Sequence, residues 1–199
     1  MTCRGVGRLP LMSRELIVTE NMTVDGVIDM SAGWFEPGGD AAEEDVAEMR
    51  EVEERLRSDV DALLVGRATF EAFRSYWPNQ TEDRTGVSEY LNHVHKYVVS
   101  STLTEPGWEP TTVLSGAVAT EVTALKAQDG GTIVATGSLT LVPALVAAGL
   151  VDEYRLMVYP YVAGEGTRLF ESPVDRPHLD LVESHGFSNG IVLLRYRPR

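Results

Sequence analysis

The sequence is poor in thiols, in long apolar runs and in positive charge. Cys3 is its single cysteine, which excludes an intramolecular disulfide and a thiol-clustered metal site and fits a reducing cytoplasm. No apolar run approaches the roughly 20 residues that a membrane helix needs. The chain has 17 Lys and Arg against 30 Asp and Glu, and its formal net charge of −13 repels nucleic-acid phosphates and anionic membranes. We therefore expect neither as a partner. The four histidines lack carboxylates at metal-ligand spacing, so no metal is expected.

The remaining composition is that of an ordinary soluble domain. The chain has 199 residues, of which 43% are hydrophobic and 24% are charged. The first eleven residues carry two arginines but no sustained apolar region, so we do not interpret them as a signal peptide. We expect residues 1–13 to be an N-terminal arm and residues 14–199 to be one domain.

Strand-like and helix-like patterns alternate along most of the chain. Short apolar, β-branched runs are separated by segments of helical spacing, and near the end Ser188-Asn189-Gly190 is typical of a hairpin turn. The predicted strands are 15–20, 62–65, 97–100, 112–114, 132–136, 152–158, 179–185 and 191–196, and the predicted helices are 40–56, 69–76, 87–95, 118–128 and 139–148. This order predicts an α/β fold, with a mostly parallel central sheet, helices on both faces and a C-terminal antiparallel hairpin.

Four segments place Gly, Ser, Thr or Arg where a predicted strand gives way to a loop or a helix. They are Met22–Gly26, Val65–Phe70, Val99–Thr102 and Ala135–Leu139. An open α/β sheet binds phosphorylated ligands at such junctions, because helix N-termini and bare backbone present free N–H groups there. Four junctions in one small domain favour a nucleotide-like ligand over a purely structural explanation.

The ordered set of motifs resembles the dihydrofolate reductase-like family, and more closely the reductase domain of the bifunctional riboflavin-biosynthesis deaminase-reductase and its stand-alone relatives. The resemblance covers residues 14–197. The segments that carry it are Thr23-Val24-Asp25-Gly26, Gly66-Arg67-Ala68-Thr69, Ser100-Ser101, Gly137-Ser138-Leu139, Leu150-Val151-Asp152-Glu153 and Gly164–Phe170. It implies a cytoplasmic, homodimeric, NADPH-dependent oxidoreductase that transfers hydride to a flat heterocyclic or ribosylamino small molecule, with 5-amino-6-(5-phosphoribosylamino)uracil as the implied substrate. No deaminase zinc motif is present.

The resemblance also implies which residues hold the cofactor. Gly66, Arg67 and Thr69 would bind a phosphate, because Gly permits close approach and Arg can bind phosphate in a bidentate way. Ser100, Ser101 and Thr102 would hold the adenosine 2′-phosphate, which favours NADP over NAD. The pyrophosphate would be bound by a third group of residues, which consists of Thr136, Gly137, Ser138 and Leu139. Each segment can also be explained by structure alone, as an ordinary turn or the start of a helix.

The substrate and acid assignments depend on the loop after the first strand. The resemblance places Asn21, Thr23 and Asp25 near the nicotinamide or the substrate, and Trp34 could stack on a flat ring or pin its own loop. True dihydrofolate reductases have a carboxylate at the start of the first helix. Asp40 there is better explained as an N-cap, whereas Asp45 is carried with Asp25 as a candidate catalytic residue, and Glu44 as a further candidate.

Two other functions remain open. One is dihydrofolate or other pterin reduction, which is disfavoured because Thr136 stands where that branch has the first glycine of a Gly-Gly pair. The other is a non-catalytic, dimeric nucleotide-binding protein. Oxidation of bound NADPH would separate both enzymes from the binding protein.

Overall fold

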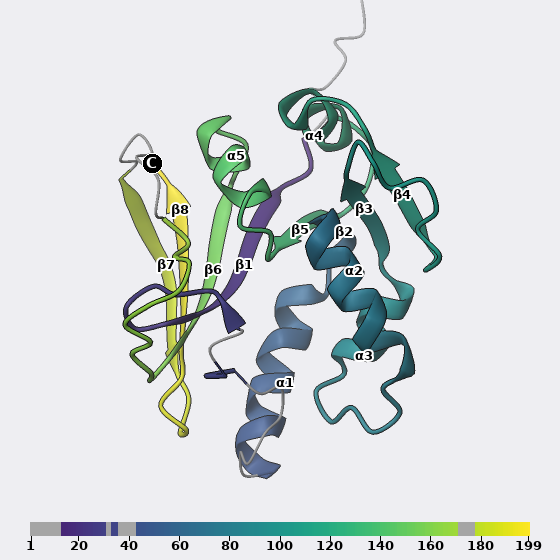
Figure 1. The fold of residues 1–199 in the computed structure, drawn as a ribbon. Helices are drawn as coiled ribbons and strands as arrows, with labels where there is room; N and C mark the ends of the chain where they lie inside the picture. Colours follow the sequence, from purple (N-terminus) through teal and green to yellow (C-terminus); the bar gives the residue numbers. More distant parts are fainter. Residues whose placement is uncertain (1–12, 31–32, 36–42, 171–177) are drawn as a thin grey trace, which may run out of the picture.

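The computed structural model describes residues 13–30, 33–35, 43–170 and 178–199. Its centre is an eight-stranded sheet with helices packed on both faces (Figure 1). The strands lie in the order β4-β3-β2-β5-β1-β6-β8-β7. The elements are β1 (Leu16–Thr23), α1 (Glu43–Arg57), β2 (Val60–Gly66), α2 (Arg67–Tyr76), the 3-10 helix η2 (Trp77–Asn79), α3 (Val87–His93), β3 (His95–Val99), β4 (Thr111–Leu114), α4 (Val118–Lys126), β5 (Thr132–Thr136), α5 (Leu141–Ala147), β6 (Glu153–Tyr159), β7 (Leu179–Gly186) and β8 (Val192–Pro198).

The pairing of the strands confirms the predicted fold class. Strands β1 to β6 pair in parallel, whereas β8 is antiparallel to both β6 and β7. The hairpin turns at the predicted Asn-Gly, where Gly190 has a φ of +86° that few other residues adopt. Because the parallel strands run the same way, the loops that follow β1, β2, β3 and β5 leave from one edge of the sheet.

The core is divided by the sheet into two layers. Leu16 and Val18 of β1 pack with side chains of α4 and α5, whereas Ile17 between them packs with Phe70 of α2 and Leu91 of α3. Successive side chains of a strand point to opposite faces, so this alternation puts α4 and α5 on one face and α2 and α3 on the other. A strand covered on both faces needs a continuous apolar run, which is the pattern that the sequence displays.

Several boundaries differ from the predicted ones, and three of these differences have a clear structural reason. Strand β1 continues to Thr23 because β6 pairs with it over this stretch. His95 belongs to β3 and not to the preceding helix. Helix α5 begins at Leu141 and not at Leu139, because Gly137 and Ser138 both have positive φ values, of +60° and +66°, which a right-handed helix does not allow.

Some predictions concern residues that the structure does not describe. The N-terminal arm and the Asp40 cap lie outside the described residues, and the one-domain organisation stays a prediction. Within the described ranges, no helix is long and apolar enough to cross a bilayer. No three His, Cys, Asp or Glu side chains of these ranges are grouped so that they could hold a metal ion.

Candidate cofactor site

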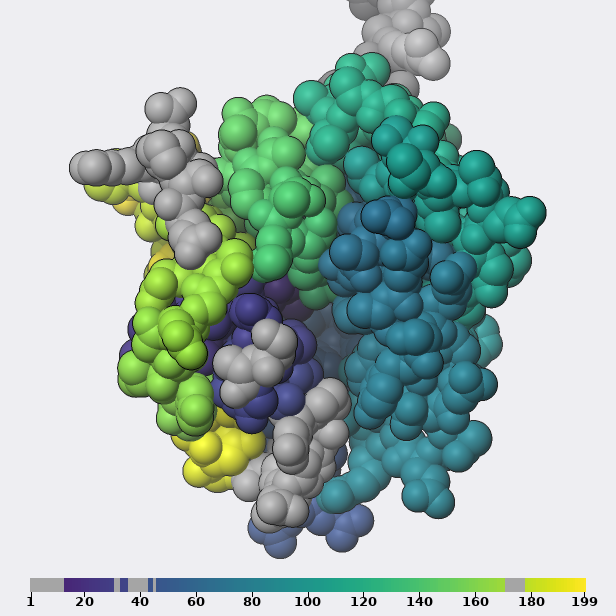
Figure 2. All heavy atoms as spheres, in the orientation of Figure 1, coloured from purple at the N-terminus to yellow at the C-terminus, as the bar shows by residue number. Residues whose placement is uncertain are grey.

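The predicted phosphate-binding segments meet at the carboxyl edge of the parallel strands. Gly66 at the end of β2 is paired in register with Val99 of β3, and Thr136 at the end of β5 is paired with Thr19 of β1. The chain leaves β2 for one face of the sheet and leaves β5 for the other, which makes this edge a topological switch point, the usual place for a ligand in an open α/β sheet. In Figure 2 the surface is hollowed where α2, α5 and the end of β1 come together.

The loops after β2 and β5 interlock through two glycines. A methyl group on Gly66 would collide with the Oγ atom of Ser138, and one on Gly137 would lie 2.9 Å from the Cγ2 atom of Thr69. Two motifs that are about 70 residues apart in the sequence therefore form one surface. Each glycine therefore lets the two loops approach each other closely, with the opposite side chain in the space that a Cβ atom would fill.

Helix α2 offers an uncompensated positive end to this surface. Its N-cap is Gly66, with no side-chain hydrogen bond to the first turn, and that turn contains no acidic residue. The Arg67 side chain is 52% exposed, and its Nη1 atom lies 3.4 Å from Glu71 Oε1. Free N–H groups, the helix dipole and a guanidinium together attract an anion. An anion would therefore be attracted locally to this surface despite the formal net charge of −13.

Ser138 shapes the start of α5. It is the one non-glycine residue with positive φ among those described, a conformation that costs of order 1 kcal/mol. Its Oγ atom accepts the N–H of Leu141 at 3.2 Å, and its carbonyl accepts that of Val142 at 3.2 Å. The hydroxyl is thus engaged in holding the loop over Gly66. Leu139, the last residue of this predicted group, has an exposed side chain.

The three hydroxyl residues after β3 divide into two roles. Ser100 is buried, and its Oγ atom accepts the N–H groups of Thr102 at 3.2 Å and of Leu103 at 3.0 Å. Ser100 therefore builds the turn, whereas Ser101 and Thr102 are exposed at the same edge of the sheet, with the Thr102 hydroxyl 3.5 Å from Ser100 Oγ.

Asp25 holds two loops together. It accepts a hydrogen bond from the Thr23 hydroxyl at 2.7 Å and from the backbone N–H groups of Ala163 at 3.0 Å and Gly164 at 2.9 Å. These bonds hold its pKa well below the usual range, and Arg168 lies 3.4 Å away. Thr23 itself is fully buried. Both side chains are thus engaged in fixing the loop after β1, and their predicted roles toward a substrate stay predictions.

The other predicted substrate and acid residues lie around β1 and α1. Trp34 is buried, donates its Nε1–H to the Asp29 carbonyl at 2.7 Å and packs edge-on against Tyr159, which is the pinning alternative raised from the sequence. Asn21 is half-buried near the end of β1. Asp45 lies in α1, and its side chain is outside what the structure describes.

Glu20 is the site residue that sequence reasoning missed. It lies on β1 with 2% of its surface exposed. Burial raises its pKa to about 8, although a hydrogen bond from the Gly137 backbone partly offsets this effect. Its Oε1 atom has no hydrogen-bond partner among the described residues. The signal in the sequence was a glutamate at the end of the apolar run Leu-Ile-Val-Thr-Glu, a poor place for a charge unless a partner or a ligand meets it.

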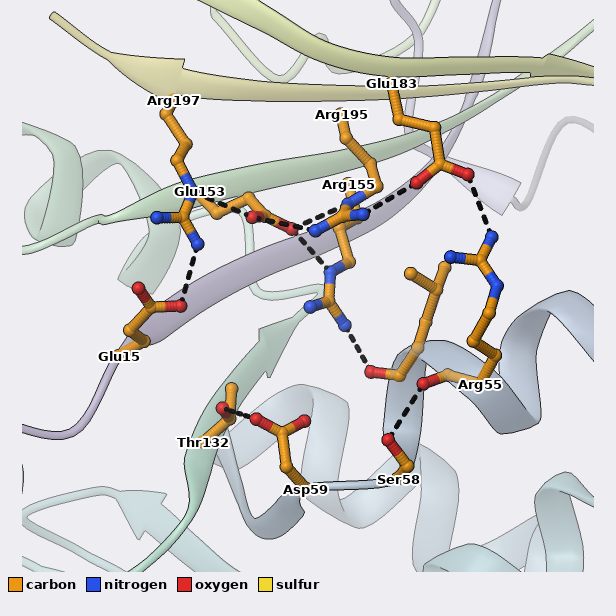
Figure 3. Close-up of polar contacts among 11 residues, drawn as sticks. Glu15, Arg55, Ser58, Asp59, Thr132, Glu153, Arg155, Glu183, Arg195 and Arg197 are labelled. Atoms are coloured by element: carbon orange, nitrogen blue, oxygen red, sulfur yellow. Dashed lines mark hydrogen bonds and ion pairs between the residues drawn. The ribbon is translucent and has the colours of Figure 1, made fainter.

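A second buried glutamate lies on β6, the strand next to β1, and is fully paired. Glu153 of β6 has no exposed surface and receives Arg155 at 2.8 Å, Arg195 at 2.9 Å and Arg197 at 3.1 Å (Figure 3). Burial opposes its ionisation, but the three guanidinium groups outweigh burial and lower its pKa to about 2. Glu183 extends this network through Arg195 at 2.6 Å.

Comparison with known proteins bears on the same motifs. The family model described as the RibD C-terminal domain matches residues 14–193. The chain belongs to this family. It is 31% identical over 192 residues to the uncharacterized protein YyaP of Bacillus subtilis, an alignment that covers 94% of this chain and 96% of YyaP. The family is therefore the one that the sequence motifs resemble.

Two solved structures share the fold of this RibD C-terminal domain. One is a Shewanella sp. PV-4 protein whose name refers to riboflavin biosynthesis, with a TM-score of 0.68, 19% identity, and 93% of this chain and 99% of that one covered. The other is dihydrofolate reductase from Enterococcus faecalis complexed with NADP(H), with a TM-score of 0.62, 16% identity, and coverage of 93% and 96%. The expected dihydrofolate reductase-like fold is confirmed.

Proposed function

We propose that this protein is an NADPH-dependent reductase of the riboflavin-biosynthesis type. The observation that carries the proposal is the interlocking of Gly66 with Ser138 and of Gly137 with Thr69, beside the N-terminus of α2. This contact holds the two segments expected to bind the pyrophosphate side by side, next to the guanidinium group of Arg67. The residues fit a dinucleotide because the contact places the uncapped N-terminus of α2 and the exposed Arg67 next to the loop that follows β5.

The residues along the sheet edge have separate tasks in this proposal. Arg67 and the first turn of α2 bind and orient the phosphates, and the exposed hydroxyl groups of Ser101 and Thr102 bind the 2′-phosphate that distinguishes NADPH from NADH. Asp25 holds the loop after β1 against residues 163–168. When bound, the cofactor supplies the hydride, and the protein supplies orientation and a site that excludes water.

The proposed substrate is a flat heterocyclic or ribosylamino compound of the class represented by 5-amino-6-(5-phosphoribosylamino)uracil. Membership of the RibD C-terminal domain family supports this choice, as does the fold shared with the Shewanella protein. The catalytic roles of Asp25 and Asp45, the substrate contacts of Asn21, Thr23 and Trp34, a cytoplasmic location and a homodimer stay predictions.

Titration of the protein with NADPH and NADH, followed by the fluorescence of the reduced nicotinamide, tests the proposal. We expect saturable binding of NADPH, weaker binding of NADH, and a Kd that rises about tenfold in Arg67→Ala, since a hydrogen bond to a charged group contributes about 1.5–3 kcal/mol. Arg50→Ala is the matched control, because Arg50 also pairs with a glutamate one helical turn away on an exposed helix face, at 2.7 Å from Glu54.

The control should bind both nucleotides as the unmodified protein does. Ser101→Ala and Thr102→Ala should reduce the preference for NADPH by several-fold and leave NADH binding unchanged. If neither nucleotide binds below millimolar concentration, the proposed function is wrong. If NADPH binds but no pyrimidine or pterin oxidises it, the non-catalytic nucleotide-binding protein replaces the reductase.

A further inference from the structure

Glu20 lies where the pairing between β1 and β5 ends. β5 pairs with β1 only as far as Thr19, opposite Thr136, whereas β6 pairs with β1 up to Thr23. Glu20 is therefore the first residue of β1 that has lost β5 on one side. The next residue of the β5 chain is Gly137, whose backbone hydrogen-bonds the Glu20 carboxyl group. The buried carboxyl group is therefore in contact with one of the segments predicted to bind the cofactor.

The carboxyl group of Glu20 has one oxygen atom without a partner. Oε1 is buried and receives no hydrogen bond from the described residues. A buried oxygen atom without a hydrogen bond costs about 1–3 kcal/mol. Beside a ligand site, a hydrogen bond from the ligand can remove this cost. Because its pKa is raised to about 8, the group is neutral at pH 7 and offers both an O–H donor and a C=O acceptor.

The order of the strands indicates which part of the ligand comes close. The exposed Ser101 and Thr102 follow β3, Gly66 and Arg67 follow β2, Gly137 follows β5, and Glu20 is on β1. These four strands are neighbours, so Glu20 lies three strand spacings, about 14 Å, from the proposed 2′-phosphate residues. A dinucleotide with its 2′-phosphate at β3 and its pyrophosphate at β2 and β5 brings its nicotinamide end to β1.

A primary carboxamide is the complement of a neutral carboxyl group. Its N–H donates to the C=O of the acid, and its C=O accepts the acid's O–H. An ionised carboxylate could only accept, and it would add negative charge next to an anionic ligand. With 2% exposure, the group also lacks the solvent contact through which a proton donor is replenished, which favours binding over acid catalysis.

We propose that the carboxyl group of Glu20 binds the carboxamide of the nicotinamide ring and so orients the ring at the end of β1. This inference rests on the proposed function, since it needs a nicotinamide dinucleotide in the site. It adds Glu20 to Asn21, Thr23, Asp25 and Trp34, the residues predicted from the sequence to lie near the nicotinamide or the substrate.

The test compares three ligands by calorimetry: NADP, its 3-acetylpyridine analogue, which lacks the carboxamide N–H groups, and 2′,5′-ADP, which lacks the nicotinamide. The principal variant is Glu20→Met, which keeps the length of the side chain but removes both oxygens. We expect about a tenfold rise in Kd for NADP, a smaller rise for the analogue and no change for 2′,5′-ADP. Glu20→Gln, which keeps a donor and an acceptor, should bind NADP within about threefold of the unmodified protein.

Ser101→Ala is the matched control, because Ser101 lies after β3, at the other end of the proposed site. This substitution should weaken the binding of NADP and of 2′,5′-ADP equally. If the unmodified protein binds none of the ligands, the proposed function fails. If it binds all three and Glu20→Met weakens NADP no more than 2′,5′-ADP, the proposal for Glu20 is wrong and the function stands. Should Glu20→Met not fold, the unmodified protein decides, since equal affinity for NADP and the acetyl analogue also contradicts the proposal.

Discussion

Two buried glutamates lie on neighbouring strands, and their carboxyl groups differ in ionisation and in hydrogen bonding. Glu153 of β6 is ionised, with a pKa lowered to about 2, because three arginines from β6 and β8 surround it. Glu20 of β1 is neutral, with a pKa raised to about 8, and one of its oxygen atoms has no partner among the described residues. A buried charge that serves only the fold is paired within the fold. The unpaired carboxyl lies at the edge where the predicted cofactor residues meet.

The largest expected effect is on the paired glutamate. Glu153→Gln removes the carboxylate that pairs with the buried Arg155, whereas Arg195 keeps Glu183 and Arg197 keeps Glu15, so we expect a loss of about 3–5 kcal/mol in the free energy of unfolding. Urea denaturation measures this loss. Glu183→Gln is the control: Glu183 is more exposed, and its loss should cost about 1 kcal/mol or less. Glu153 would not be a purely structural residue if Glu153→Gln lowered the free energy of unfolding no more than the control, or if it weakened NADPH binding by the folded protein.

The unpaired glutamate should have a stability effect that depends on pH. The pKa of Glu20 is about 8 in the folded state and near 4.5 in the unfolded state. Between these values the folded protein keeps a proton that the unfolded chain has released, so its stability falls as pH rises. Glu20→Gln removes this dependence. We expect the variant to gain about 2–4 kcal/mol relative to the unmodified protein between pH 4.5 and pH 8.

Denaturation of both proteins at a series of pH values provides the measurement. A constant difference between them across this range would mean that Glu20 is ionised in the folded state, and the contrast with Glu153 would disappear.

A smaller effect is expected where the two loops of the site touch. Gly66→Ala places a methyl group against Ser138 Oγ, which should cost about 1–2 kcal/mol of stability and weaken NADPH binding. Ser138→Gly removes both the opposing hydroxyl and the unfavourable φ of +66°. The double variant should therefore lose less than the sum of the two single losses, a coupling that thermal denaturation and NADPH titration can measure. Strictly additive losses would contradict the contact.

The sequence predicted the fold well because its signals were local. Apolar runs, the Asn-Gly turn at Gly190 and the residues at strand ends identified the sheet and the edge where its loops gather. The predicted start of α5 was wrong by two residues, because nothing in the sequence indicates that Ser138 adopts a positive φ. That conformation depends on its contact with Gly66, which lies about 70 residues earlier.

The site was predictable in its segments but not in its contacts. Gly66, Arg67 and Gly137 could be assigned to phosphate binding from motifs alone. Glu20 and Glu153, in contrast, look alike in the sequence, since each is a glutamate in a predicted strand or at its end. What separates them is whether arginines from β8 reach the carboxyl group, and the pairing of β6 with β8 determines that.

Hydrogen exchange of the protein with and without saturating NADPH tests the central claim most directly, because it locates the ligand without any substitution. We expect slower exchange at 66–69, at 137–141 and at 20–21, which are the segments at the carboxyl edge of the parallel strands. Protection confined to other segments, such as the pocket lined by Trp77 and Asp83, would contradict it, as would saturable binding that leaves the exchange of 137–141 unchanged.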